Sequence, residues 1–99
     1  MLKMQLIGLI GKAVNMLIKF SKAFCKTYAK SPEDIKIAFK KKLLVFKEDK
    51  FDRQLSNHRL NGDFSHIRSI NITGDWRALF IEGEDIIDFI LLGTHSNLY

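Results

Sequence analysis

Apolar residues recur at helical spacing between residues 21 and 48 and at strand spacing from residue 67 onward. A short apolar run at residues 16–20 predicts a strand, and the spacing that follows predicts helices over residues 21–30 and 31–48. From residue 67 onward, apolar residues alternate with polar ones or run together between turn residues, which is typical of strands. Three further strands are therefore expected, at residues 67–72, 76–82 and 86–93.

The second helix has the clearest start in the sequence. Ser31-Pro32-Glu33-Asp34 combines a capping serine, a proline at the first helical position and two acids in the first turn. Only Ser31 and Pro32 separate this helix from the one before it, so the two are expected to form a helical hairpin. The buried stripe of the second helix is expected at Ile35, Ala38, Phe39, Leu43 and Phe46.

The order of these elements predicts the fold class. One strand, two helices and three strands in succession favour an α+β domain, in which a two-helix hairpin packs on one sheet that ends in an antiparallel meander. The strand at residues 86–93 is so apolar that it is expected near the centre of the sheet. Residues 50–62 between the helices and the meander are polar and are expected to be irregular.

The first fifteen residues stand apart from this pattern. They are apolar, yet they fall short of the roughly 20 residues that span a bilayer and end without a clear signal-peptidase site. We expect residues 1–15 to be an N-terminal extension of a single domain at residues 16–99, without a membrane partner. The single cysteine, Cys25, excludes an intramolecular disulfide, which fits the reducing cytoplasm.

The charge of the chain is strongly asymmetric. The formal net charge is +5, and residues 1–60 carry 14 Lys and Arg against 5 Asp and Glu, whereas residues 61–99 carry 2 against 6. A basic half on a small domain is typical of proteins that bind phosphate groups. A lysine-rich, merely solvated surface has the same composition, so charge alone leaves both interpretations open.

Three segments carry a more specific signal. They are Asn57-His58-Arg59-Leu60-Asn61-Gly62, the stretch from Arg68 to Arg77 and the terminal Gly93-Thr94-His95-Ser96-Asn97-Leu98-Tyr99. In this order and at this spacing they resemble the RelE/ParE toxin superfamily, above all its YafQ-like messenger-RNA interferases. That group shares an H-x-L-x-G turn, a D-W pair and a G-T-H-x-x-L-aromatic ending, and the resemblance covers about residues 16–99.

The resemblance implies a biological role. It implies a compact RelE-like toxin of a type II toxin–antitoxin system, which enters the ribosomal A site in the cytoplasm and cleaves messenger RNA there. It also implies a cognate antitoxin that wraps the toxin and masks it.

The resemblance also implies site residues. The positions that the YafQ-like group uses in or beside its active site are occupied here by His58, Asp75, Trp76, His95 and Tyr99. Arg68 and Arg77 fall where related toxins carry basic residues that face phosphate. Asn71 stands where the YafQ-like pattern has a second strand histidine, which leaves the division of acid and base roles open.

These residue types suit RNA cleavage without a metal. The reaction needs a base for the 2′-hydroxyl, an acid for the leaving 5′-oxygen and positive charge at the phosphate. Because no carboxylates cluster at metal-ligand spacing, neither a metal nor another cofactor is expected. We expect His95 to be the acid, since imidazole titrates near neutral pH, and Asp75 or His58 to be the base or to orient it.

The remaining candidates would hold the RNA. Arg77 and Arg68 are expected to share one sheet face and to grip the scissile phosphate with their guanidinium groups. Trp76 and Tyr99 are expected to stack on unpaired bases. The lysines on the outer face of the second helix are expected to meet ribosomal RNA; they are Lys36, Lys40, Lys41 and Lys47.

Two other functions remain open at this point. A ParE-like toxin would inhibit DNA gyrase by binding and would cut no RNA, but such a binder does not need the titratable His58, Asp75 and His95. A basic nucleic-acid-binding module with a decayed catalytic site is the second alternative, and Asn71 is the residue that favours it.

Overall fold

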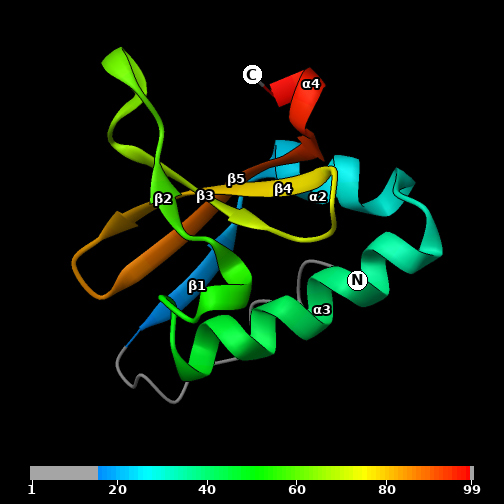
Figure 1. Cartoon of the computed structure of the whole chain (residues 1–99), viewed down its shortest axis with the longest axis horizontal. Helices are drawn as coiled ribbons and strands as arrows, with labels where there is room; N and C mark the ends of the chain where they lie inside the picture. Colours follow the sequence, from blue (N-terminus) through cyan, green and yellow to red (C-terminus); the bar gives the residue numbers. More distant parts are fainter. Residues whose placement is uncertain (1–15, 99) are drawn as a thin grey trace.

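The computed structural model describes residues 16–98, so the expected extension at residues 1–15 and the candidate Tyr99 lie outside the described residues. Figure 1 shows a sheet with a long helix along one side. In chain order the elements are β1 (Leu17–Phe20), α2 (Lys22–Lys30), α3 (Glu33–Glu48), a 3-10 turn (Arg53–Leu55), β2 (His58–Arg59), a second 3-10 turn (Gly62–Phe64), β3 (Ile67–Asn71), β4 (Trp76–Gly83), β5 (Ile86–Thr94) and α4 (His95–Leu98).

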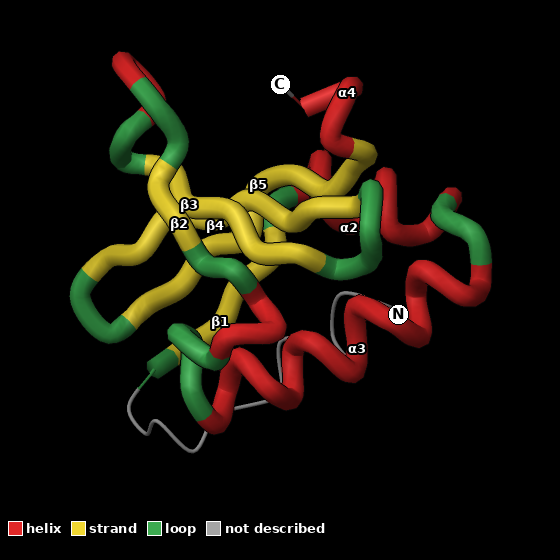
Figure 2. Tube along the Cα trace, in the orientation of Figure 1, coloured by secondary structure: helices red, strands yellow, loops and turns green. Residues whose placement is uncertain are grey.

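The five strands form one sheet in the order β1-β5-β4-β3-β2. β1 runs parallel to β5, and the other neighbours are antiparallel. The predicted α+β class is confirmed, and β5 lies between β1 and β4, as its apolar sequence predicted. Besides the two 3-10 turns, the sequence did not predict β2, which consists of two residues, or α4 at the end of β5 (Figure 2).

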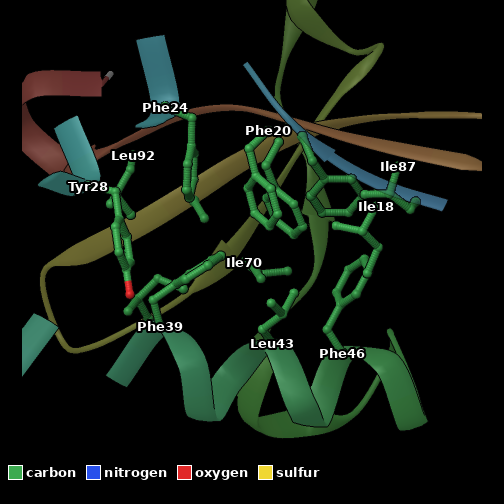
Figure 3. Close-up of a cluster of buried hydrophobic side chains, with 14 of the residues drawn as sticks. Ile18, Phe20, Phe24, Tyr28, Phe39, Leu43, Phe46, Ile70, Ile87 and Leu92 are labelled. Atoms are coloured by element: carbon green, nitrogen blue, oxygen red, sulfur yellow. The ribbon is translucent and has the colours of Figure 1, made fainter. Parts of the chain in front are cut away.

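A cluster of aromatic rings joins the helices to one face of the sheet. Phe89 of β5 lies at its centre, with its ring centroid 5.8 Å from those of both Phe24 in α2 and Phe39 in α3. Phe20 of β1 stacks on Phe89 at 5.6 Å. All four side chains are buried, and each contributes roughly 1.5–3 kcal/mol to the free energy of folding. Figure 3 shows how α3 supplies one wall of this core.

Tyr28 completes the aromatic cluster at the end of α2. Its ring is 1% exposed and packs edge-on against Phe39. Burial, and secondarily the nearby Glu33 carboxylate, raises the pKa of Tyr28 above its ordinary value of 10.0. The raised pKa reflects the cost of placing a charged phenolate in the core.

The start of α3 differs in one detail from the prediction. Ser31 does not cap α3, because its hydroxyl donates to the carbonyl oxygen of Thr27 at 2.8 Å and its backbone N–H donates to that of Tyr28. Ser31 thus ends α2. Pro32 occupies the N-cap of α3, and Glu33 and Asp34 fill its first turn as expected. The prediction failed because the linker is so short that one serine can serve only one of the two helices.

A bulge in β5 sets which of its residues face the helices. Leu79 lies opposite Leu91, but the next residue of β4, Phe80, lies opposite Phe89, so Ile90 is the extra residue. One extra residue reverses the alternation along a strand. Phe89 and Leu92 can therefore both be buried against the core.

Ser21 ties this bulge to the first helix. Its hydroxyl donates to the carbonyl oxygen of Ile90 at 2.7 Å and accepts from the backbone N–H of Phe24 at 3.0 Å. The same side chain thus caps α2 and provides a hydrogen-bond donor for the carbonyl oxygen at the bulge.

Among residues 16–98, no helix is long and apolar enough to cross a membrane.

Replacing Ser21 tests this double role. Ser21→Ala should lower the free energy of unfolding by about 1–3 kcal/mol, because it removes a helix cap and leaves a part-buried carbonyl without its donor. Ser21→Thr retains the hydroxyl and should recover most of the loss. Urea unfolding followed by circular dichroism measures both values, and a loss below about 0.5 kcal/mol for Ser21→Ala would contradict the assignment.

Candidate functional site

The face of the sheet away from the helices carries the candidate site. Ala78 belongs to the core cluster beneath the helices, and because strand residues alternate between faces, its neighbours Arg77 and Leu79 face the other way. Across the sheet, the register brings His58, Ser69, Leu79 and Leu91 into one row on this open face. His58 of β2 therefore stands at one edge of an apolar floor.

A cleft of about 580 Å³ lies over this row. One wall is the segment from β2 to the following 3-10 turn, and the other is α4; in Figure 1 both lie on the side of the sheet opposite α3. Its lining residues are His58, Arg59, Leu60, Asn61, Phe64, Ile67, Leu79, Leu91, His95 and Leu98. The structure thus brings together two of the three histidines, His58 and His95, which are 37 positions apart in the sequence.

The ring of His58 is held in one orientation, which defines the tautomer of its neutral form. Its Nδ1 lies 2.7 Å from the carbonyl oxygen of Ser56, and a carbonyl can only accept, so Nδ1 carries a proton. In the neutral ring Nε2 is then unprotonated and able to accept a proton. Ser56 adopts the left-handed conformation, with φ 47°, which is uncommon for a serine. Local backbone strain of this kind is typical of functional sites.

His95 opens α4 directly after β5. Its backbone N–H donates to the carbonyl oxygen of Asp75 at 2.8 Å, which ties α4 to the turn between β3 and β4. Gly93 gives the returning α4 room, since a Cβ at this position would lie 3.2 Å from the Leu98 side chain. The glycine and leucine of the terminal motif therefore pack α4 over the open face, and the backbone of His95 ties it there.

Arg77 is fixed on the same face as His58. Its Nη1 donates to the carbonyl oxygens of Thr73, Gly74 and Trp76 at 3.0, 3.2 and 3.0 Å. Its partner on β5 is Gly93, which has no side chain. Arg77 does not line the cleft, and it lies one row away on the open face.

Asp75 contributes to the site through its backbone. Its side chain is exposed in the turn between β3 and β4, and its carbonyl oxygen holds α4. Asn71 lies opposite Arg77 on the open face, where the resemblance expects a histidine. Neither residue lines the cleft.

The prediction that Arg68 and Arg77 share a face is wrong. The turn pairs Asn71 with Arg77, so Arg68 lies opposite the buried Phe80 and faces the helix side. The two arginines are nine positions apart, and this odd separation across the turn places them on opposite faces. The sequence could not reveal this without the length of the turn.

Trp76 and the lysines also lie away from the cleft. Trp76 is on the same face as Ala78, and its indole packs partly buried against the hydrophobic core. This placement favours a structural role over base stacking. α3, with Lys36, Lys40, Lys41 and Lys47, runs along the opposite side of the sheet from the cleft (Figure 2).

Sequence reasoning missed the aromatic side chain that does line the cleft. Phe64 follows the Asn61-Gly62 turn and is 59% exposed, although phenylalanine is usually buried. Its position after a turn and away from any apolar alternation was the available signal. No group of three His, Cys, Asp or Glu side chains within residues 16–98 is placed to hold a metal ion.

Comparisons with known proteins agree with this architecture. A family model described as a bacterial toxin of a type II toxin–antitoxin system, YafQ, matches residues 13–99. YafQ from Escherichia coli BL21(DE3) has a similar structure, with a TM-score of 0.65 and 18% identity over 85% of this chain and 98% of that one. No curated protein sequence matches.

Two solved complexes contain a similar chain. The match in the E. coli DinJ–YafQ complex has a TM-score of 0.64 and 19% identity, covering 85% of this chain and 98% of that chain. The match in the archaeal RelE–RelB complex from Pyrococcus horikoshii has a TM-score of 0.66 and 15% identity, covering 84% and 98%. At these identities the structures establish a shared fold.

The contact between Gly93 and Leu98 makes a stability prediction. Gly93→Ala should cost about 1–3 kcal/mol of unfolding free energy, because the new methyl group crowds Leu98. The same substitution made in a Leu98→Ala background should cost less by about 1 kcal/mol, since the crowding partner is gone. Urea unfolding of the four proteins completes the double-mutant cycle, and additive losses would show that Gly93 does not position α4.

Proposed function

The chain belongs to the YafQ family of bacterial toxins of type II toxin–antitoxin systems, and we propose that it is a metal-free endoribonuclease that cleaves messenger RNA on the ribosome. The observation that supports this most directly is the cleft on the open face. It holds two imidazole side chains from separate elements over an apolar floor, and the oriented guanidinium group of Arg77 lies one row away on the same face of the sheet.

The two histidines can divide the proton transfers between them. His58 Nε2 removes the proton from the ribose 2′-hydroxyl, and the 2′-oxygen attacks the adjacent phosphorus. His95, as the imidazolium, donates a proton to the 5′-oxygen while its bond to phosphorus breaks. The products are a 2′,3′-cyclic phosphate and a 5′-hydroxyl. A base and an acid on opposite walls of one cleft suit this in-line displacement.

This assignment makes His58, rather than Asp75, the base. The bond from Nδ1 to the Ser56 carbonyl oxygen presents Nε2 as an acceptor, whereas the Asp75 carboxylate lies outside the cleft. Asp75 acts as a positioning residue, because its carbonyl oxygen holds the first residue of α4. The loss of a histidine at Asn71 then removes neither the proposed acid nor the proposed base.

Arg77 supplies positive charge for the phosphorane-like transition state. Three carbonyl oxygens hold its Nη1, so its guanidinium group is oriented before RNA arrives and loses little freedom on binding. Nε and Nη2 stay able to donate to phosphate oxygens. The exposed ring of Phe64 takes the base-stacking role that the sequence assigned to Trp76.

We also propose a protein partner. The similar chains from E. coli and P. horikoshii were solved in complex with DinJ and RelB, respectively. A cognate antitoxin that covers this toxin in the cytoplasm is the corresponding partner here. Ribosomes and messenger RNA complete the set of partners.

Alanine substitutions of the two histidines test the mechanism. His58→Ala and His95→Ala should each lower the cleavage rate by roughly 10²–10⁴-fold, the usual contribution of general acid–base catalysis. Glu84→Ala, at an exposed turn at the other end of β5, should cleave like the wild type. The measurement is primer extension on an abundant transcript after induction in a bacterial host. Growth arrest without codon-phased cleavage, unchanged by either histidine variant, would instead indicate a gyrase inhibitor.

The lysines of α3 allow a separate test of ribosome binding. If Lys40 and Lys41 contact ribosomal RNA, Lys40→Gln/Lys41→Gln should reduce the slope of log K against log salt by about 0.7–0.9 for each lost phosphate contact. Lys22→Gln/Lys26→Gln on α2 removes the same charge and should leave the slope near the wild-type value. Ribosome pelleting at several salt concentrations gives the slopes, and identical slopes for all three proteins would remove this role from α3.

A further inference from the structure

A second cleft lies across the β2 edge from the first. It has a volume of about 650 Å³ and opens where the start of β3 and the end of β4 meet the segment after α3. Its lining residues are Lys50, Phe51, Arg59, Ser65, His66, Arg68, Ile81 and Glu82. α3 has already ended at Glu48, so its helical turns do not extend over this corner of the sheet.

The cleft carries excess positive charge. Its lining includes Lys50, Arg59 and Arg68 but only one carboxylate, Glu82, which forms an ion pair with Lys50. Within residues 16–98 neither arginine has an acidic partner. Two guanidinium groups therefore remain available to an anion from outside the chain. Because Arg59 and Arg68 lie opposite each other on β2 and β3, their side chains project from the same face.

Arg68 is held in place for such a contact. Its Nε donates to the side-chain oxygen of Asn57 at 2.8 Å, and its guanidinium carbon lies 5.3 Å from the centre of the Phe51 ring. Lys50 Nζ lies 5.7 Å from the same centre. Phe51 nevertheless remains 57% exposed. An exposed ring flanked by fixed cations is the arrangement that binds a nucleobase and its neighbouring phosphate.

β2 is the shared wall of the two clefts. His58 and Arg59 are consecutive, so their side chains point to opposite faces of this two-residue strand, and Arg59 lines both clefts. A single RNA strand that crosses the sheet edge at β2 can place one phosphate beside His58 and a flanking phosphate beside Arg59 and Arg68.

We propose that the cleft around Arg59, Arg68 and Phe51 is a second binding site for single-stranded RNA, which takes a phosphodiester and a stacked base that flank the scissile bond. The proposal that this cleft binds RNA depends only on the geometry and charge of the cleft. The continuity of one strand between the two clefts rests on the proposed ribonuclease function.

Direct binding in the absence of cleavage tests this proposal. In a His95→Ala background, the affinity for a fluorescent oligouridine of about 12 nucleotides is measured by anisotropy. Arg59→Gln and Phe51→Ala should each weaken binding by about 5- to 100-fold, the range typical of lost stacking and phosphate contacts. The charge-matched Lys26→Gln on the exposed side of α2 should change it by less than about 2-fold.

A dinucleotide separates the two clefts. It is too short to reach across β2, so the gain in affinity from the dinucleotide to the oligouridine should shrink in Phe51→Ala, because Phe51 lines the second cleft and not the first. Arg68→Gln also removes the bond to Asn57, so the exposed Arg59 and Phe51 are the decisive positions. Affinities for the oligouridine within about 2-fold of the parent would overturn the proposal.

The same variants distinguish an RNA-binding cleft from one that binds an acidic protein segment. They also distinguish failure of this proposal from failure of the proposed catalytic roles. If Arg59→Gln and Phe51→Ala keep their affinity for RNA but lose the antitoxin, the cleft is a protein site and the proposal is overturned. If His58→Ala and His95→Ala cleave like the wild type while Arg59→Gln and Phe51→Ala bind RNA weakly, the proposed function fails and the second RNA site stands.

Discussion

The packing of Phe89 against rings from β1, α2 and α3 is the interaction on which the rest of the structure depends. It fastens both helices to one face of the sheet and leaves the other face open. The bulge at Ile90 then reverses the alternation of β5, so that Leu92 is also buried and Gly93 falls on the open face. Without that extra residue, Leu92 and Gly93 would each face the other side of the sheet, and the terminal segment would leave β5 toward the helices. The position of His95 is thus a consequence of core packing.

The functional surfaces lie where the core ends. β2 is only two residues long, and its alternation directs His58 to the open face and Arg59 to the helix side. In an edge strand of two residues, one side chain points to each face of the sheet, and the two lie close together. One edge can therefore serve a cleft with two histidines and a cleft with two arginines.

Much of the fold was readable from the sequence, because the apolar periodicities of the two helices and three strands of the meander are strong. Ser31 was misassigned because two helices compete for it, and β2 escaped notice because two residues form no pattern. The candidate site depended on the resemblance, which pointed to His58 and His95 before any geometry was known. The faces of Arg68 and Trp76 could not be predicted, because they follow from the exact pairing of Asn71 with Arg77. The left-handed backbone of Ser56, which orients the His58 ring, leaves no trace in the residue types.

The proposed cleavage mechanism requires His58 and His95 to contact the same phosphodiester from opposite walls of one cleft. The direct test is histidine-ring NMR during titration with an RNA trinucleotide that carries a 2′-O-methyl group at the scissile position and so cannot be cleaved. If both histidines contact the RNA, their ring signals shift together, with one dissociation constant, while methyl signals of the exposed Ile37 and Leu44 on α3 stay in place. Shifts confined to α3, or to one histidine alone, would contradict the mechanism.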